Sequence, residues 1–179
     1  MPRIPRGQQG GYAYHVINRG NGRGTVFHKT QDYEAFLSLL AEAKKRHRVK
    51  LFGFCLMPNH FHLVVEPAHQ TALSQFMQWL LTSHVRRYHK HYGSSGHVWQ
   101  GRFKSFAVQR DEYLITTLRY VLQNPVRAGL SETVHEKRKL SCWTKPMERR
   151  SKSRGRWLTS TPSTKMAPSS SQKKPSPGG

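Results

Sequence analysis

Acidic side chains are scarce in this chain of 179 residues: 9 Asp and Glu stand against 30 Lys and Arg, a formal net charge of +21 at pH 7. Long apolar runs are also missing, and a bilayer-spanning helix needs roughly 18 such residues. An integral membrane role is therefore excluded. The N-terminal sequence has no apolar segment or cleavage site of the secretory kind, so we expect a cytoplasmic protein.

Cysteine is equally rare. Cys55 and Cys142 are the only two, too few for a disulfide framework or a cysteine zinc site, and we expect both to be inert. The large positive charge instead predicts binding to a polyanion, because Lys and Arg neutralise phosphates and release their counterions. Nucleic acid is the leading candidate partner.

The composition divides the chain into three parts. Residues 1–130 carry the alternating apolar patterns of one folded domain, and residues 131–150 form a C-terminal segment. Residues 151–179 are basic and rich in Ser, Pro and Gly, with too few apolar side chains to offset the entropy of ordering. We interpret them as a disordered basic tail, which either raises nonspecific affinity for DNA or RNA or is simply a solvated end.

Apolar periodicity predicts the elements of the folded domain. Helices are expected where apolar residues recur every three or four positions: residues 31–47, 71–91 and 111–123. Strands are expected at residues 12–18, 51–56, 60–66 and 98–108. The last helix should stop at the Asn124–Pro125 step. Strands separated by helices, with one hairpin among them, indicate an α+β fold whose helices lie mainly on one face of the sheet.

His60 and His62 form the sharpest local signal. Side chains alternate in a strand, so these two imidazoles share one face while Phe61 and Leu63 share the other. Their backbone positions are about 7 Å apart, from which both rings can converge on one metal ion or phosphate. The ordinary alternative is one hydrogen-bonded core histidine and one exposed histidine.

The last helix supplies a candidate nucleophile. Tyr113, Thr117, Tyr120 and Asn124 fall on one face, away from the apolar stripe of Leu114, Ile115, Leu118, Val121 and Leu122. Tyr120 and Asn124 are one turn apart, so a phenol and an amide can address the same site. A tyrosine is a poor nucleophile until a base or cation favours its ionised form. Otherwise such a tyrosine packs its ring and exposes its hydroxyl.

Two segments mix cations with residues suited to nucleic acid. Residues 96–106 interleave Trp99, Phe103 and Phe106 with Arg102 and Lys104. Aromatic faces can stack unpaired bases while cations hold the backbone, although the same aromatics could instead pack in the core. The glycine-rich run of residues 19–24 places two arginines, Arg19 and Arg23, in a weaker candidate loop for phosphates.

Four stretches together resemble one family: HVINRGN (15–21), LMPNHFHLVV (56–65), GHVWQGRFKS (96–105) and RYVLQNPVRAGL (119–130). They are similar to the REP-associated tyrosine transposases, within the wider single-tyrosine transposases and His-hydrophobe-His endonucleases. The resemblance spans roughly residues 11–130, in order. It implies a palm of the ferredoxin-like or RNA-recognition-motif-like type.

The resemblance also implies the site. His60 and His62 would bind a divalent cation, Tyr120 would be the nucleophile, and Asn124 stands where the wider family has a polar third ligand. Tyr113 lies outside the family's tyrosine position. The cation would be Mg²⁺, or Mn²⁺, which suits imidazole better. Candidate DNA contacts are Arg19, Arg23, Trp99, Arg102, Phe103, Lys104 and Arg127.

By the same resemblance, the protein would be a single-stranded DNA endonuclease and strand transferase. Tyr120 would attack a phosphate of a hairpin-forming palindromic repeat and form a 5′-phosphotyrosine. Relatives are monomers or homodimers. Two alternatives keep the fold: a nucleic-acid-binding protein that does not cleave, and a phosphodiesterase that uses activated water instead of Tyr120. Residues 131–150 diverge from the family pattern, with Trp143 as its one recognisable remnant.

Overall fold

The computed structural model describes residues 9–109, 111–129 and 142–144. Its three α-helices are α1 (Thr30–Arg46), α2 (Ala72–Tyr92) and α3 (Glu112–Arg127), preceded by the short 3-10 turn η1 (Asn21–Arg23). Its strands are β1 (Ala13–Arg19), β2 (Val49–Met57), β3 (His60–Pro67), β4 (Lys104–Val108) and β5 (Cys142–Thr144). The expected tail at residues 151–179 lies outside the described residues.

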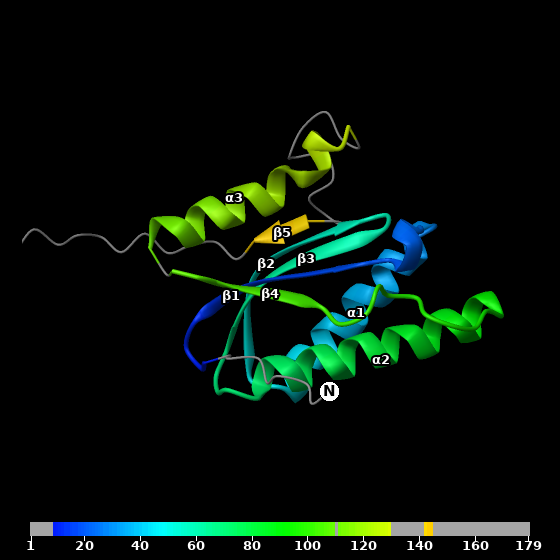
Figure 1. Ribbon diagram of the computed structural model, residues 1–179, viewed down its shortest axis with the longest axis horizontal. Helices are drawn as coiled ribbons and strands as arrows, with labels where there is room; N and C mark the ends of the chain where they lie inside the picture. Colours follow the sequence, from blue (N-terminus) through cyan, green and yellow to red (C-terminus); the bar gives the residue numbers. More distant parts are fainter. Residues whose placement is uncertain (1–8, 110, 130–141, 145–179) are drawn as a thin grey trace, which may run out of the picture. The chain divides into compact units, whose positions relative to one another are not determined.

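The five strands form one antiparallel sheet in the order β4-β1-β3-β2-β5 (Figure 1). Strands β1 and β2 are connected through α1, and β3 and β4 through α2. The first four strands thus have the arrangement of a ferredoxin-like palm, which confirms the predicted α+β fold. Strand β5 adds to the outer edge of β2, so part of the predicted segment 131–150 belongs to the sheet.

Helices cover both faces of the sheet (Figure 1). Alternation along β3 sends Phe61, Leu63 and Val65 into the larger core with α1 and α2, where all three are fully buried. Val64 enters a smaller cluster with Leu118 and Val121 of α3. Two helices therefore lie on one face, as predicted, and α3 lies on the other. The face of β3 that carries the histidines is the one beneath α3.

The segment expected to be extended over residues 98–108 is a strand only at Lys104–Val108. The preceding residues form a loop whose large side chains turn inward: Trp99 is 5% exposed and Phe103 is 6% exposed. Both belong to the core beneath α1 and α2. The packing alternative is therefore correct for these two aromatics, and base stacking by them is wrong.

Helix α3 does not stop at the Asn124–Pro125 step but continues to Arg127 with Pro125 inside it. Proline has no N–H to donate to the carbonyl of Val121, four residues earlier. The Asn124 side chain compensates, because its Nδ2 donates to the carbonyls of Tyr120 at 3.0 Å and Val121 at 3.4 Å. The buried stripe is also narrower than predicted, since Ile115 is 37% exposed.

Candidate active site

Strand β3 presents His60 and His62 toward α3, as its alternation requires. His62 is buried and His60 is half-buried, and their ring centroids are 5.1 Å apart in an edge-to-face arrangement. The hairpin residue before them holds the outer ring, because Asn59 Oδ1 lies 2.6 Å from His60 Nδ1. Two imidazoles thus lie side by side on one face, as predicted.

A third histidine, from β1, completes this group. His15 Nε2 lies 2.9 Å from His62 Nδ1, so one ring donates the shared hydrogen bond and the other accepts it. The two rings are also stacked, with centroids 5.1 Å apart. The sequence interpretation missed His15. Its place in a predicted strand was visible, but only the pairing of β1 with β3 shows that it faces His62.

Tyr120 of α3 lies against these imidazoles. Its ring meets the rings of His62 and His15 edge-on, with centroid distances of 6.1 and 6.2 Å, and it is 42% exposed. The guanidinium of Arg127 lies 5.5 Å from its ring centroid. Tyr113 lies two turns earlier on α3 and is 66% exposed. The phenol of Tyr120 and the paired imidazoles therefore lie in one place on the molecule.

Burial keeps the imidazoles neutral. It lowers the pKa of His62 to about 3, and the neighbouring imidazoles and Arg19 add to the shift. Burial also lowers the pKa of His15, and burial together with the charge of Arg19 lowers the pKa of His60. All three rings are therefore unprotonated at neutral pH. A neutral imidazole is the form that binds a metal ion.

Hydrogen bonds to the backbone join the loop after β1, the β2–β3 turn and the loop before β4 beside this site. Gly20 N donates to the carbonyl of Asn59 at 2.7 Å, and Asn59 Nδ2 donates to the carbonyl of Arg23 at 3.1 Å. Gln100 N donates to the carbonyl of Arg19 at 2.8 Å. The loop after β1 is thus bonded both to the β2–β3 turn that precedes His60 and to the loop before β4. These contacts position the histidine pair.

This loop needs glycine at position 20. A Cβ there would collide with the carbonyl oxygen of Gly24 and would stand 2.7 Å from Val26 Cγ2. Asn18, the residue two before it, is 5% exposed, and its Oδ1 accepts from Arg19 N at 3.0 Å. The run HVINRGN thus contains one histidine that faces the site and several residues that shape the backbone beside it.

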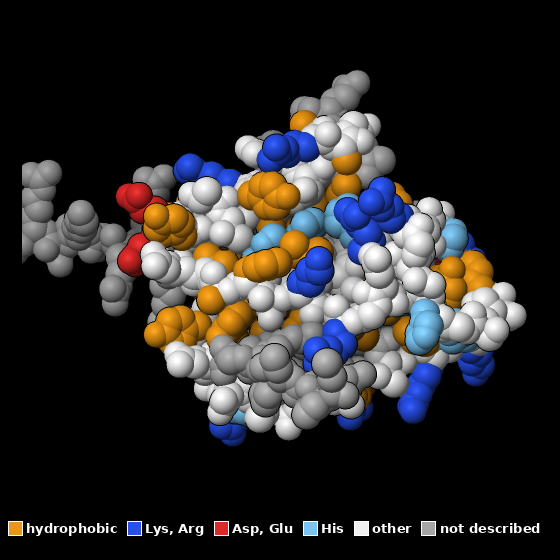
Figure 2. Space-filling model, viewed as in Figure 1, with side chains coloured by type: hydrophobic (Ala, Val, Ile, Leu, Met, Phe, Trp, Pro, Cys, Tyr) orange, Lys and Arg blue, Asp and Glu red, His pale blue; other side chains and the backbone are white. Residues whose placement is uncertain are grey.

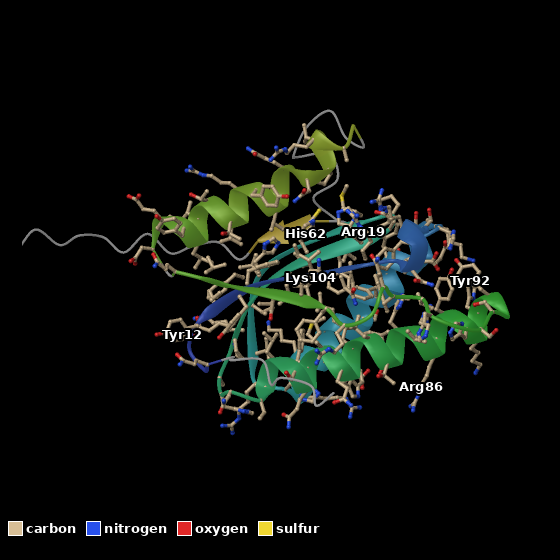
Figure 3. The ribbon with its side chains drawn as sticks, in the orientation of Figure 1. Tyr12, Arg19, His62, Arg86, Tyr92 and Lys104 are labelled. Atoms are coloured by element: carbon tan, nitrogen blue, oxygen red, sulfur yellow. The ribbon has the colours of Figure 1, made fainter. Side chains whose placement is uncertain are left out.

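The predicted cationic contacts fall in two places. Arg19, Lys104 and Arg127 are exposed; Arg19 is opposite His60 in the β1–β3 register, and Lys104 begins β4 (Figure 3). Arg23 and Arg102 are exposed on the two loops described above. Figure 2 shows histidine side chains near the centre of the view, with Lys, Arg and exposed hydrophobic side chains around them.

The chemistry of two neutral imidazoles and an amide oxygen suits a divalent cation. No group of three or more His, Cys, Asp and Glu side chains with the geometry of a metal site occurs among the described residues. Two imidazoles with an amide oxygen would leave positions for phosphate oxygens. Asn124 suits that role because its Nδ2 is turned back into α3, which leaves Oδ1 as the atom able to bind a cation.

The sequence over most of this fold matches a family of transposases. The family model "Transposase IS200 like" matches residues 8–124. The chain belongs to this family.

A curated protein of Haemophilus influenzae named "Putative REP-associated tyrosine transposase" is 25% identical over 123 residues, which cover 63% of this chain and 69% of that protein. A solved structure described as "Structure of the REP associates tyrosine transposase bound to a REP hairpin" is 18% identical, with a TM-score of 0.61. That match covers 75% of this chain and 78% of the other, and it supports the fold.

Among the helices of the described residues, none combines the length and apolar character needed to cross a bilayer.

Proposed function

We propose that this transposase-family protein is a metal-dependent endonuclease and strand transferase for single-stranded DNA. The observation that carries the proposal is the contact of the Tyr120 ring, which is 42% exposed, with the imidazoles of His62 and His15 on the face of the sheet beneath α3. A phenol, neutral imidazoles and nearby cations are the groups that phosphoryl transfer to a tyrosine needs.

Tyr120 is the nucleophile in this reaction. Its Oη loses a proton and attacks the scissile phosphorus, the bond from phosphorus to the 3′-oxygen breaks, and that oxygen takes up a proton. The products are a 5′-phosphotyrosine and a free 3′-hydroxyl. Because the phosphodiester energy stays in the covalent bond, the reverse attack by a 3′-hydroxyl rejoins DNA without a nucleotide cofactor.

His60 and His62 would hold the divalent cation, Mg²⁺ or Mn²⁺, with Asn124 Oδ1 as the third protein ligand. When bound, the cation polarises the phosphoryl oxygens and stabilises the charge that develops on them. His15 is a positioning residue, since its hydrogen bond to His62 Nδ1 fixes the ring, so that Nε2 would be the nitrogen of His62 that binds the cation.

The DNA substrate is a hairpin-forming repeat with an unpaired flank. Arg19, Lys104 and Arg127 contact phosphates beside the reacting group, and Arg23 and Arg102 contact the backbone farther along. The net charge of +21 supports a polyanionic substrate. The hairpin is proposed from the likeness to a relative whose solved structure holds one.

A labelled hairpin oligonucleotide with a single-stranded flank tests the assignment. The protein is incubated with it and Mn²⁺, and a denaturing gel separates free DNA from protein-linked DNA. We expect a covalent adduct that is lost in Tyr120→Phe and retained in the matched control Tyr113→Phe. His60→Ala should abolish the adduct and keep most of the DNA affinity, because affinity comes chiefly from the cationic surface.

The same gel separates the competing functions. Binding without any cleavage would identify a nucleic-acid-binding protein that keeps only the fold. Cleavage that survives in Tyr120→Phe would identify a phosphodiesterase that uses water. Loss of the adduct in Tyr113→Phe alone would move the nucleophile to that residue.

A further inference from the structure

We propose that Phe106 of β4 is a stacking platform for an unpaired base next to the scissile phosphate. The inference deepens the proposed function, because it adds a base-binding residue to the face that carries Tyr120. Phe106 is 53% exposed. It differs in this from Trp99 and Phe103, the other aromatics of residues 98–108, which are buried in the core.

Phe106 lies close to the proposed reacting groups. It pairs with His15 in the β1–β4 register, and the two ring centroids are 6.5 Å apart. The ring of Tyr120 lies 6.2 Å from the same imidazole, and the ring of His62 lies 5.1 Å from it. His15 is thus flanked by an exposed phenyl ring of the edge strand and by the proposed nucleophile of α3.

Lys104 provides the charge that such a platform needs. It lies two residues before Phe106, so both side chains are on the same face of β4, about 7 Å apart along the strand. An aromatic face beside a cation on an exposed strand is the arrangement that binds a base and its phosphate together. Stacking tolerates any base, because every base has a π face.

The positive charge around Phe106 indicates which kind of molecule would bind to its exposed ring. Arg19 and Lys104 on the sheet and Arg127 at the end of α3 are exposed cations, and a second copy of the chain would bring a further +21 charges toward them. An apolar partner would leave those cations poorly solvated. A single DNA strand satisfies both features, because its bases are flat and its backbone is anionic.

Binding without cleavage tests the platform. In a Tyr120→Phe background with EDTA, fluorescence anisotropy measures the affinity for a labelled hairpin with an unpaired flank. We expect Phe106→Ala to weaken binding about tenfold and Phe106→Trp to restore it. Tyr12→Ala is the matched control: Tyr12 is 51% exposed but lies immediately before β1, away from His62 (Figure 3), so its removal should change affinity less than twofold.

A set of oligonucleotides with one abasic nucleotide each locates the contact. If Phe106 stacks on one base, the loss in Phe106→Ala disappears when that single nucleotide is abasic and persists at the others. Equal losses at every position, or no loss at all, would overturn the proposal. So would sedimentation data in which Phe106→Ala converts a dimer to a monomer, because the ring would then contact a second copy. A position-specific loss in a protein that forms no covalent adduct would keep the platform and reject the nuclease assignment.

Discussion

His15 is expected to influence metal binding although it is not one of the proposed metal ligands. Its ring holds His62 through a 2.9 Å hydrogen bond and a stacked contact. Because an outer partner fixes a ligating imidazole, we expect His15→Leu to lower the affinity for Mn²⁺ by about 10- to 100-fold. His15→Gln should recover part of it, since an amide can replace the hydrogen bond. Calorimetric titration of Mn²⁺ measures the change.

The control for this prediction is His91→Leu, which removes an exposed histidine of α2, a helix on the opposite face of the sheet. Its Mn²⁺ affinity should match that of the unmodified protein. An unchanged affinity in His15→Leu would contradict the positioning role and leave His15 as a packing residue.

His84 makes the stability of the fold depend on pH. It is 4% exposed, its ring lies near Phe36 and Trp99, and its Nδ1 has no hydrogen-bond partner among the described residues. Burial lowers its pKa to about 4; Arg87 acts in the same direction and Asp32 opposes. The unfolded chain therefore binds more protons between pH 6.5 and 4, and stability falls as pH falls through this window.

The expected loss from His84 is about 3 kcal/mol across that window. Urea unfolding at a series of pH values, in EDTA, measures it. The buried histidines beneath α3 shift stability in the same sense, so the difference between the unmodified protein and His84→Gln isolates this residue. Parallel stability curves for the two proteins would show that His84 binds protons as readily in the folded protein as in the unfolded chain. His91→Gln, which changes an exposed side chain of the same helix, is the matched control.

At the scale of elements, the end of α3 combines two roles in one side chain. Asn124 supplies the hydrogen bonds that Pro125 cannot, and its Oδ1 is the proposed third metal ligand. Asn124→Ala should therefore lower the free energy of unfolding by about 1 kcal/mol and also remove the covalent adduct. The double variant Asn124→Ala with Pro125→Ala regains a backbone N–H for Val121, so its stability should return without the adduct.

Thermal unfolding and the adduct gel measure the two effects separately. Gln123→Ala is the control, because it changes an exposed side chain in the same turn of α3. An adduct that returns together with stability in the double variant would show that Asn124 acts on the helix alone.

The strands and helices that enclose the larger core were predictable from the sequence because their apolar periods are long and regular. The limits of α3 were not, since a proline normally ends a helix and the compensating bonds of Asn124 depend on the folded turn. Trp99 and Phe103 could not be assigned from their spacing. Stacking and core packing use the same residue types, and only tertiary contacts with α1 and α2 distinguish them.

The candidate site was predictable only in part. Alternation along one strand was enough to place His60 and His62 together, and one helix face was enough to bring Tyr120 near Asn124. The partnership of His15 with His62 depends on the pairing of β1 with β3, two strands far apart in the sequence. Periodicity describes a single element, so contacts between elements stay beyond its reach.

At the scale of the whole molecule, the charge distribution predicts how DNA binding responds to salt. Each phosphate that a cation neutralises on a single strand contributes about −0.7 to the slope of log affinity against log salt. Arg19→Ala and Lys104→Ala should each make this slope shallower by about that amount. Phe106→Ala should weaken binding without changing the slope, because stacking releases no counterions.

Anisotropy titrations of one hairpin oligonucleotide give these slopes. The salt concentration is varied from about 50 to about 200 mM, because such affinities change strongly over this range. Arg86→Ala is the control: this exposed arginine of α2 lies on the side of the molecule away from α3 (Figure 3), so its loss should leave the slope nearly unchanged. If removing Arg86 changed the slope as much as removing Lys104, DNA would be held by the overall charge of the molecule. Electrostatic binding would then no longer be directed to the face that carries Tyr120.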